Sequence, residues 1–151
     1  MKTISYSYDG SFEAFLCVIR HAAVYQTEVI DIVPKRPGKM VKQSLFPGME
    51  IPTDQKEATL ALEWLHSFLN PYSLRFFLLA WLSENQGVEM DLWKFLQYTL
   101  HLKDPGQVLD HFQEPIVSRL ILLARQVSGE AHRLKGLIRF RMIQEDTFYG
   151  P

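Results

Sequence analysis

The densest group of ionisable side chains lies near the end of the chain, in the stretch EAHRLKGLIRFR. A glutamate and a histidine so close together could act as a general acid and base. Lysine and arginine side chains instead favour binding to phosphate oxygens, which position a protein on nucleic acid without reading its sequence. The residues available for either chemistry are Glu130, His132, Arg133, Lys135, Arg139 and Arg141.

A second basic stretch lies earlier, in PKRPGKMVKQSLFPG, and contains no acidic residue. Its basic residues are Lys35, Arg36, Lys39 and Lys42. The net charge of the whole chain is only -1, so acids elsewhere balance both stretches. Local asymmetry of this kind can attract a polyanion even when the net charge is near zero. The alternative is an ordinary solvated surface.

A third group of candidates lies near the start of the chain, where Tyr8, Asp9 and Phe12 surround a turn at Asp9-Gly10. An aspartate at a strand-to-helix corner could be a catalytic carboxylate. More often it caps the helix or shapes the turn. We therefore expect a structural role for Asp9, and an acid–base pair of Asp9 and His132 is the less favoured alternative.

The chain lacks the motifs of the common catalytic and cofactor sites. There is no HExxH, no nucleotide loop of the type GxxxxGK[ST] or GxGxxG, and no GxSxG elbow. His111 and Glu114 have the spacing of two metal ligands, but Pro115 disturbs that register and a bare pair is a weak signal. The sequence therefore assigns no metal, no cofactor and no catalytic residue, and it leaves open whether the protein is an enzyme.

Length and composition are typical of one globular domain. The 151 residues are 47% hydrophobic and 22% charged, and the single cysteine, Cys17, excludes a disulfide within the chain. The N-terminus has no apolar segment of the secretory type, and the most apolar run, Phe76–Leu82, is far too short to span a bilayer. We expect a cytoplasmic protein without a membrane partner.

The pattern of apolar residues predicts mainly helices. Residues 4–8 alternate between apolar and polar, which predicts a strand, and residues 28–33 could form another. A loop of about 15 residues follows. The segment 72–82 is apolar almost all round, which predicts a buried central helix. Helices are predicted to begin near Phe12, Asp54, Asn70, Met90, Asp104 and Pro115.

The hydrophobic period changes within the terminal basic stretch, at Gly136. The last helix should end there, and the alternation of Ile138, Phe140 and Met142 predicts a strand. A turn and a short returning strand at Phe148-Tyr149 would complete a hairpin. We therefore predict a predominantly helical α+β fold of about five or six helices, with a small sheet formed by the N-terminal strand and the C-terminal hairpin.

Four motifs together resemble one protein family. YSYDGSFEAFL at the front, QSLF and IPTDQKEA in the middle, and EAHRLKGLIRF near the end occur in this order. They are similar to the bacterial "probable DNA metabolism protein" family over nearly the whole chain. Members of that family continue past the hairpin with a proline-rich segment. The resemblance therefore implies that residues 1–151 form a single domain, the N-terminal part of a longer architecture.

The resemblance also implies a role in DNA metabolism. Family members are typically encoded beside a radical-SAM protein assigned to DNA modification or repair, and some are fused to a uracil-DNA glycosylase domain. The motifs include Tyr8, Asp9, Phe12 and Glu130 besides the basic residues. We expect an accessory module that works with such a partner. It would contact DNA phosphates through the basic residues of the terminal stretch. A protein-interaction adaptor without DNA contact is the main alternative, and an acid–base enzyme using Asp9 and His132 is a weaker one.

Overall fold

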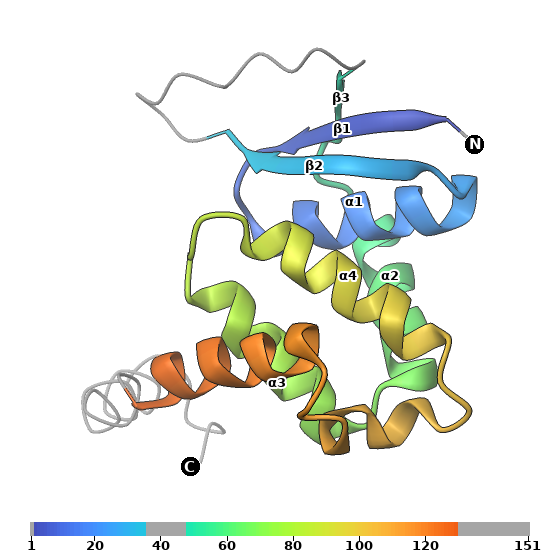
Figure 1. Ribbon diagram of the computed structural model, residues 1–151. Helices are drawn as coiled ribbons and strands as arrows, with labels where there is room; N and C mark the ends of the chain where they lie inside the picture. Colours follow the sequence, from blue (N-terminus) through green and yellow to red (C-terminus); the bar gives the residue numbers. More distant parts are fainter. Residues whose placement is uncertain (1, 36–47, 130–151) are drawn as a thin grey trace, which may run out of the picture.

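The computed structural model of the chain describes residues 2–35 and 48–129, and Figure 1 shows them as a small sheet with a layer of helices against one of its faces. This confirms the predicted α+β, mostly helical fold. The elements are β1 (Thr3–Tyr8), α1 (Phe12–Tyr25), β2 (Glu28–Pro34), β3 (Gly48–Glu50), α2 (Gln55–Phe68), α3 (Pro71–Leu82), α4 (Val88–Leu100), the 3-10 helix η1 (Pro105–Asp110) and a last helix over 115–129.

The sheet has the strand order β2-β1-β3, and both pairings are parallel. Tyr6 in the central strand lies opposite Ile32 in β2 and Met49 in β3. The parallel pairing of β1 with β2 needs a crossover, which α1 provides. Because side chains alternate across a strand, Ile4, Tyr6 and Tyr8 all point to one face and are buried there.

The sequence predicted that β1 would form a sheet with the C-terminal hairpin. This pairing is wrong for β1, because its two neighbours in the sheet are β2 and β3. The strand at 28–33 was predicted without a place in the sheet, and β3 was not predicted. A three-residue strand shows no usable alternation, and its pairing depends on a partner some 40 residues away along the chain. The C-terminal hairpin, predicted over 137–149, lies outside the described residues.

Helix α1 packs beneath the sheet through a stripe that includes Phe15, Val18 and Ile19. The Ser11 side chain caps its first turn by accepting a hydrogen bond from the Ala14 N–H. Asp54 caps α2 and Asn70 caps α3 in the same way, at the predicted starts of these helices. Each of these helices begins where a polar side chain accepts a hydrogen bond from backbone N–H groups of the first turn, two or three residues away.

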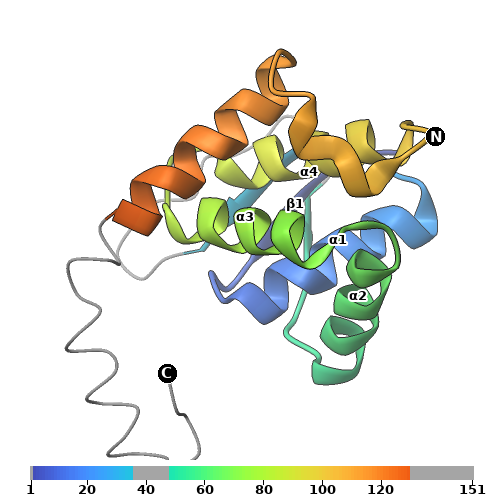
Figure 2. The ribbon, with the colours of Figure 1, turned by 90° about the horizontal axis from the view of Figure 1, so that it is seen from below.

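The prediction that residues 72–82 form a buried central helix is wrong. Phe77 and Ala80 are buried, but Tyr72, Leu78 and Leu82 are exposed. In Figure 2 α3 lies in front of α4 and the sheet, at the outer side of the helical layer. Helix α3 therefore presents apolar side chains to solvent as well as to the core, and hydropathy alone does not distinguish the two faces.

The last described helix is joined to α4 by an ion pair. The Arg119 Nε donates to the Asp91 carboxylate at 2.7 Å. Beneath it, Val117, Leu120 and Leu123 are buried against the core. None of the described helices is both long enough and apolar enough to cross a membrane.

Ser73 in the first turn of α3 provides a test of this core. Its hydroxyl is buried, and no hydrogen-bond partner for it lies among the described residues. An unpaired buried hydroxyl costs stability. Ser73→Ala is therefore expected to leave the free energy of unfolding unchanged or raise it by up to about 1 kcal/mol, measured by urea denaturation. Ser67→Ala, which removes an exposed hydroxyl from α2, serves as the control. A clear loss of stability in Ser73→Ala alone would contradict this assignment.

Candidate functional site

The described candidate residues lie together at the carboxyl edge of the sheet, where β1 and β2 end. Tyr8 is the last residue of β1, Asp9 and Phe12 follow it, and Lys35 follows β2. In open parallel sheets ligands bind at the carboxyl ends of the strands, so this edge is the expected position of a binding site. The other candidates lie outside the described residues: Arg36, Lys39, Lys42, Glu130, His132, Arg133, Lys135, Arg139 and Arg141.

Tyr8 joins the carboxyl edge to the helical layer. Its ring is buried against Phe15, with ring centroids 5.8 Å apart. Its hydroxyl donates to Oε1 of Glu89 at 2.8 Å. Glu89 lies in the first turn of α4 and is only 5% exposed. A carboxylate near a helix N-terminus is favoured by the positive end of the helix dipole. The motif position Tyr8 thus holds a buried acid that no sequence motif indicated.

Asp9 has the structural role that we expected from the sequence. Its Oδ1 accepts the Ser11 backbone N–H at 2.8 Å, and its Oδ2 accepts the Thr53 hydroxyl at 2.7 Å. Hydrogen bonding from Ser11 and then from Thr53 holds the pKa of this carboxyl below its usual value. A lowered pKa suits a permanent acceptor better than a group that must exchange protons near neutral pH.

The turn that holds Asp9 depends on Gly10 and Phe12. Gly10 has a φ of 93°, which side-chain-bearing residues rarely adopt. Phe12, the first residue of α1, packs against Trp81 of α3 with ring centroids 5.1 Å apart. The positive φ explains why a glycine stands at position 10, and packing against Trp81 explains the phenylalanine at position 12.

Lys35 stands at the open side of the same edge. Its backbone N–H donates to the Tyr8 carbonyl, and its ammonium group lies 3.0 Å from the Glu50 carboxylate of β3. Both side chains are well exposed, so this pair contributes little to stability. Lys35 therefore spans the end of the central strand and can exchange its carboxylate partner for another anion at low cost.

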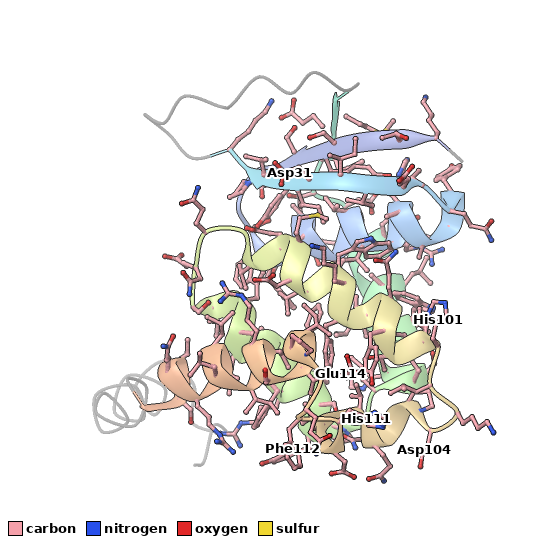
Figure 3. The ribbon with its side chains drawn as sticks, in the orientation of Figure 1. Asp31, His101, Asp104, His111, Phe112 and Glu114 are labelled. Atoms are coloured by element: carbon pink, nitrogen blue, oxygen red, sulfur yellow. The ribbon has the colours of Figure 1, made fainter. Side chains whose placement is uncertain are left out.

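The described histidines and acids far from this edge do not form a reactive cluster either. Figure 3 shows His101, Asp104, His111 and Glu114 at the end of the molecule away from the sheet. Nδ1 of His111 is hydrogen-bonded to the Tyr98 hydroxyl at 2.9 Å. Within residues 2–35 and 48–129, no group of three or more His, Cys, Asp or Glu side chains could hold a metal ion.

Among the described residues of the carboxyl edge, the carboxyl groups of Asp9 and Glu89 are already engaged by hydrogen-bond donors. Asp9 is engaged by two donors, and Glu89 is buried beneath Tyr8. The proposed proton-exchange partners of Asp9, which are Glu130 and His132, lie outside the described residues. Sequence reasoning missed Glu89, since a glutamate in the first turn of a helix is ordinary. The available signal was its position in that turn, two residues after the N-cap Gly87.

The comparisons with known proteins give one finding. The family described as "Domain of unknown function (DUF4130)" matches residues 86–151, less than half of the chain. The match begins just before α4, so it includes Glu89, η1, the helix 115–129 and the terminal basic stretch. No curated protein and no solved structure matches the chain.

The bond between Tyr8 and Glu89 should contribute strongly to stability. Tyr8→Phe removes the donor and leaves the buried Glu89 oxygen without that bond, so it should lower the free energy of unfolding by about 1–3 kcal/mol. Tyr98→Phe, which removes a bond to the exposed His111, is the control and should cost less than about 0.5 kcal/mol. Equal losses in the two variants, measured by urea denaturation, would argue against a special role for Tyr8.

Asp9 predicts a dependence of stability on pH. Because its folded pKa lies below the ordinary value of 3.8, the charged carboxylate stabilises the fold fully above that value. The stabilisation is lost as the pH falls through the lowered pKa. Wild type should therefore be more stable than Asp9→Asn at neutral pH, and the difference should disappear only in acid below 3.8. Urea denaturation of both proteins from neutral to acid pH measures it, and a pH-independent difference contradicts the assignment.

Proposed function

We propose that this chain is an accessory binding module of DNA metabolism, which contacts nucleic-acid phosphates through its two basic stretches. The partner implied by the family resemblance is a radical-SAM protein or a uracil-DNA glycosylase domain. The described residues form the scaffold from which the two stretches begin. Its carboxyl edge supplies binding groups, and among the described residues Asp9 is bonded to Ser11 and Thr53 and to no acid–base partner.

The distribution of charge supports this proposal. The described residues carry fourteen acidic and nine basic side chains, so this scaffold is acidic. The residues outside them carry seven basic and three acidic side chains. A scaffold of the opposite sign keeps the protein from binding polyanions over its whole surface, which confines contact to the basic stretches.

The single observation that carries the proposal is where the two basic stretches begin. In Figure 1 and in Figure 2, β2 and the helix 115–129 end on the same side of the molecule. The first basic stretch begins at Lys35, directly after β2, and the second follows Gly129 at the end of that helix. Both stretches therefore start from one side of the scaffold, as a shared polyanion contact requires.

A protein-interaction adaptor without DNA contact is the second candidate. An apolar surface beside the helix 115–129, which includes the exposed Phe112 and Leu122, favours it. The two functions are compatible in one molecule, since the apolar surface and the basic stretches are formed by different residues. The acid–base enzyme using Asp9 and His132 is less favoured, because the hydrogen bonds of Asp9 already explain its position.

A salt titration tests the proposal. Binding of labelled single- and double-stranded DNA should weaken linearly in log Kd against log salt, with a slope of about 0.9 per phosphate contacted on duplex DNA. Replacing Arg133, Lys135, Arg139 and Arg141 with alanine should lower both the affinity and the slope, as should Lys35→Ala with Arg36→Ala. The matched control replaces Lys94 and Lys103, two exposed lysines of the acidic scaffold, and should change neither. An absence of binding at low salt, or a slope unaltered in the variants, would overturn the proposal.

A further inference from the structure

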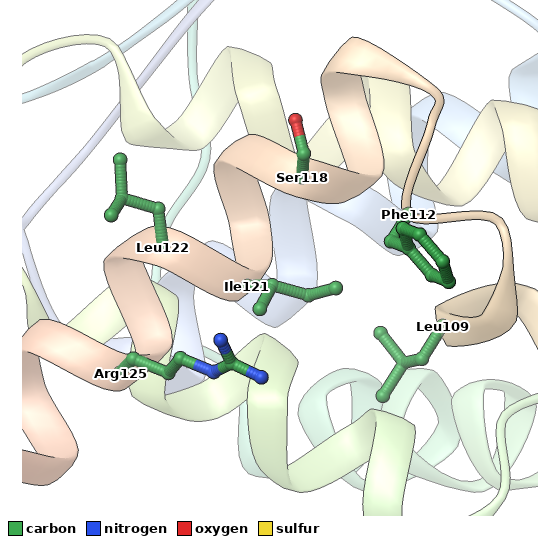
Figure 4. Close-up of a pocket in the computed structure, with 6 residues that line it drawn as sticks. All are labelled: Leu109, Phe112, Ser118, Ile121, Leu122 and Arg125. Atoms are coloured by element: carbon green, nitrogen blue, oxygen red, sulfur yellow. The ribbon is translucent and has the colours of Figure 1, made fainter.

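An open apolar trough runs beside the helix 115–129, away from the carboxyl edge. One part of it, about 430 Å³, lies between that helix and η1 (Figure 4). A second part, about 280 Å³, lies between the helix and α3. The two parts adjoin, because Arg125 lines both. We name this surface the apolar trough, and its large apolar residues are Tyr72, Phe76, Leu79, Leu109, Phe112, Ile121 and Leu122.

The helix 115–129 forms one wall of the trough with a stripe separate from its core face. Ser118, Ile121, Leu122 and Arg125 follow the spacing of one helix face, while the buried residues of the same helix point to the core. From Ser118 to Ser128 the wall is roughly 15 Å long at the rise of an α-helix. That length matches about three turns of another helix laid alongside it.

The exposed side chains of the trough are of the kinds that anchor protein interfaces. Tyr72 is 62% exposed, Phe112 is 63% exposed and Leu122 is 54% exposed. Three large apolar residues this exposed on one continuous surface are more than scattered surface residues. Tyrosine, phenylalanine and arginine are enriched where partners bind, and burying such residues supplies most of the binding energy.

Two arginines give the trough a charge preference. Arg75 of α3 and Arg125 line it, and neither forms an ion pair within the described part of the chain. In Figure 4 the Arg125 side chain extends beside Ile121 toward Leu109. Among the described residues, no acidic side chain lines either part of the trough. A carboxylate brought to either guanidinium would gain a charge-assisted, two-pronged hydrogen bond.

We propose that the apolar trough binds an acidic amphipathic helix of a partner protein. The partner helix would place apolar side chains at i, i+3 or i+4, and i+7 into the trough, and glutamates or aspartates at its margins against Arg75 and Arg125. This chain's own continuation after Gly129 is a poorer occupant, because EAHRLKGLIRFR would bring further basic residues to the two arginines. Single-stranded nucleic acid is disfavoured too, since it needs a continuous basic track, whereas Arg75 and Arg125 are the only basic residues among the described lining.

A peptide selection on the full chain tests the proposal. A display library of helical peptides of about 18 residues, long enough to hold a helix in solution, is panned on the wild type and counter-panned on Leu122→Asp. The enriched peptides should combine the apolar spacing with acidic flanks. Their affinity should fall at least about tenfold in Leu122→Asp and in Phe112→Asp. Val24→Asp, at an equally exposed apolar position on α1, is the matched control and should bind as the wild type does.

A second experiment tests the preference of the apolar trough for an acidic partner. Arg125→Glu should weaken binding of the enriched peptide and strengthen binding of the same peptide with its acids changed to lysine. No enrichment, enrichment of basic peptides, or equal binding by Arg125→Glu overturns the proposal. Displacement of the peptide by single-stranded DNA would identify nucleic acid as the occupant. Self-association in sedimentation velocity that Leu122→Asp abolishes would identify a second copy of this chain instead. Because the tested residues lie outside the basic stretches, loss of DNA binding and loss of peptide binding are separable results.

Discussion

The central position of β1 is the constraint on which the rest of the described structure depends. Its alternate side chains are buried on the helical face, and two of them are tyrosines whose hydroxyls must find partners there. Tyr6 reaches Nδ1 of His21 and Oγ1 of Thr27, which fixes the end of α1 and the start of β2. Tyr8 reaches Glu89, which fixes the start of α4. One strand thereby sets the positions of its crossover helix, its neighbouring strand and the helical layer below.

The sequence predicted what is local in this fold. Ser11, Asp54 and Asn70 cap helices at the places where polar residues precede an apolar stripe, because a cap acts across only two or three residues. The first strand was recognisable from its alternation. Its partner β3 was not, because three residues show no usable alternation and the pairing spans some 40 residues of the chain. The burial of α3 was overestimated, because an apolar helix face looks the same in sequence whether the protein's own core or solvent lies beside it.

The candidate site likewise contains one residue whose role the sequence indicated and one whose role it did not. The role of Asp9 followed from its place before a helix, and both of its oxygens are engaged there. Glu89 could not be found from sequence, since its importance comes from a tyrosine about 80 residues earlier in the chain. The trough escaped notice for a similar reason, because Tyr72, Phe112 and Leu122 come from three separate segments that only the tertiary structure brings together.

The short strand β3 has a consequence for how this protein can vary. Pairing of Gly48–Glu50 with β1 closes the connection that begins after β2, so the sheet fixes the ends of this connection at residues 35 and 48. Because β2 and β3 lie on opposite sides of β1, one strand sets both ends. Lengthening a connection between two ends fixed in this way costs only about 0.6 kcal/mol for each doubling of its length, as long as the added residues are flexible. The sheet can thus accept connections of different length between its outer strands without a change in the register of either.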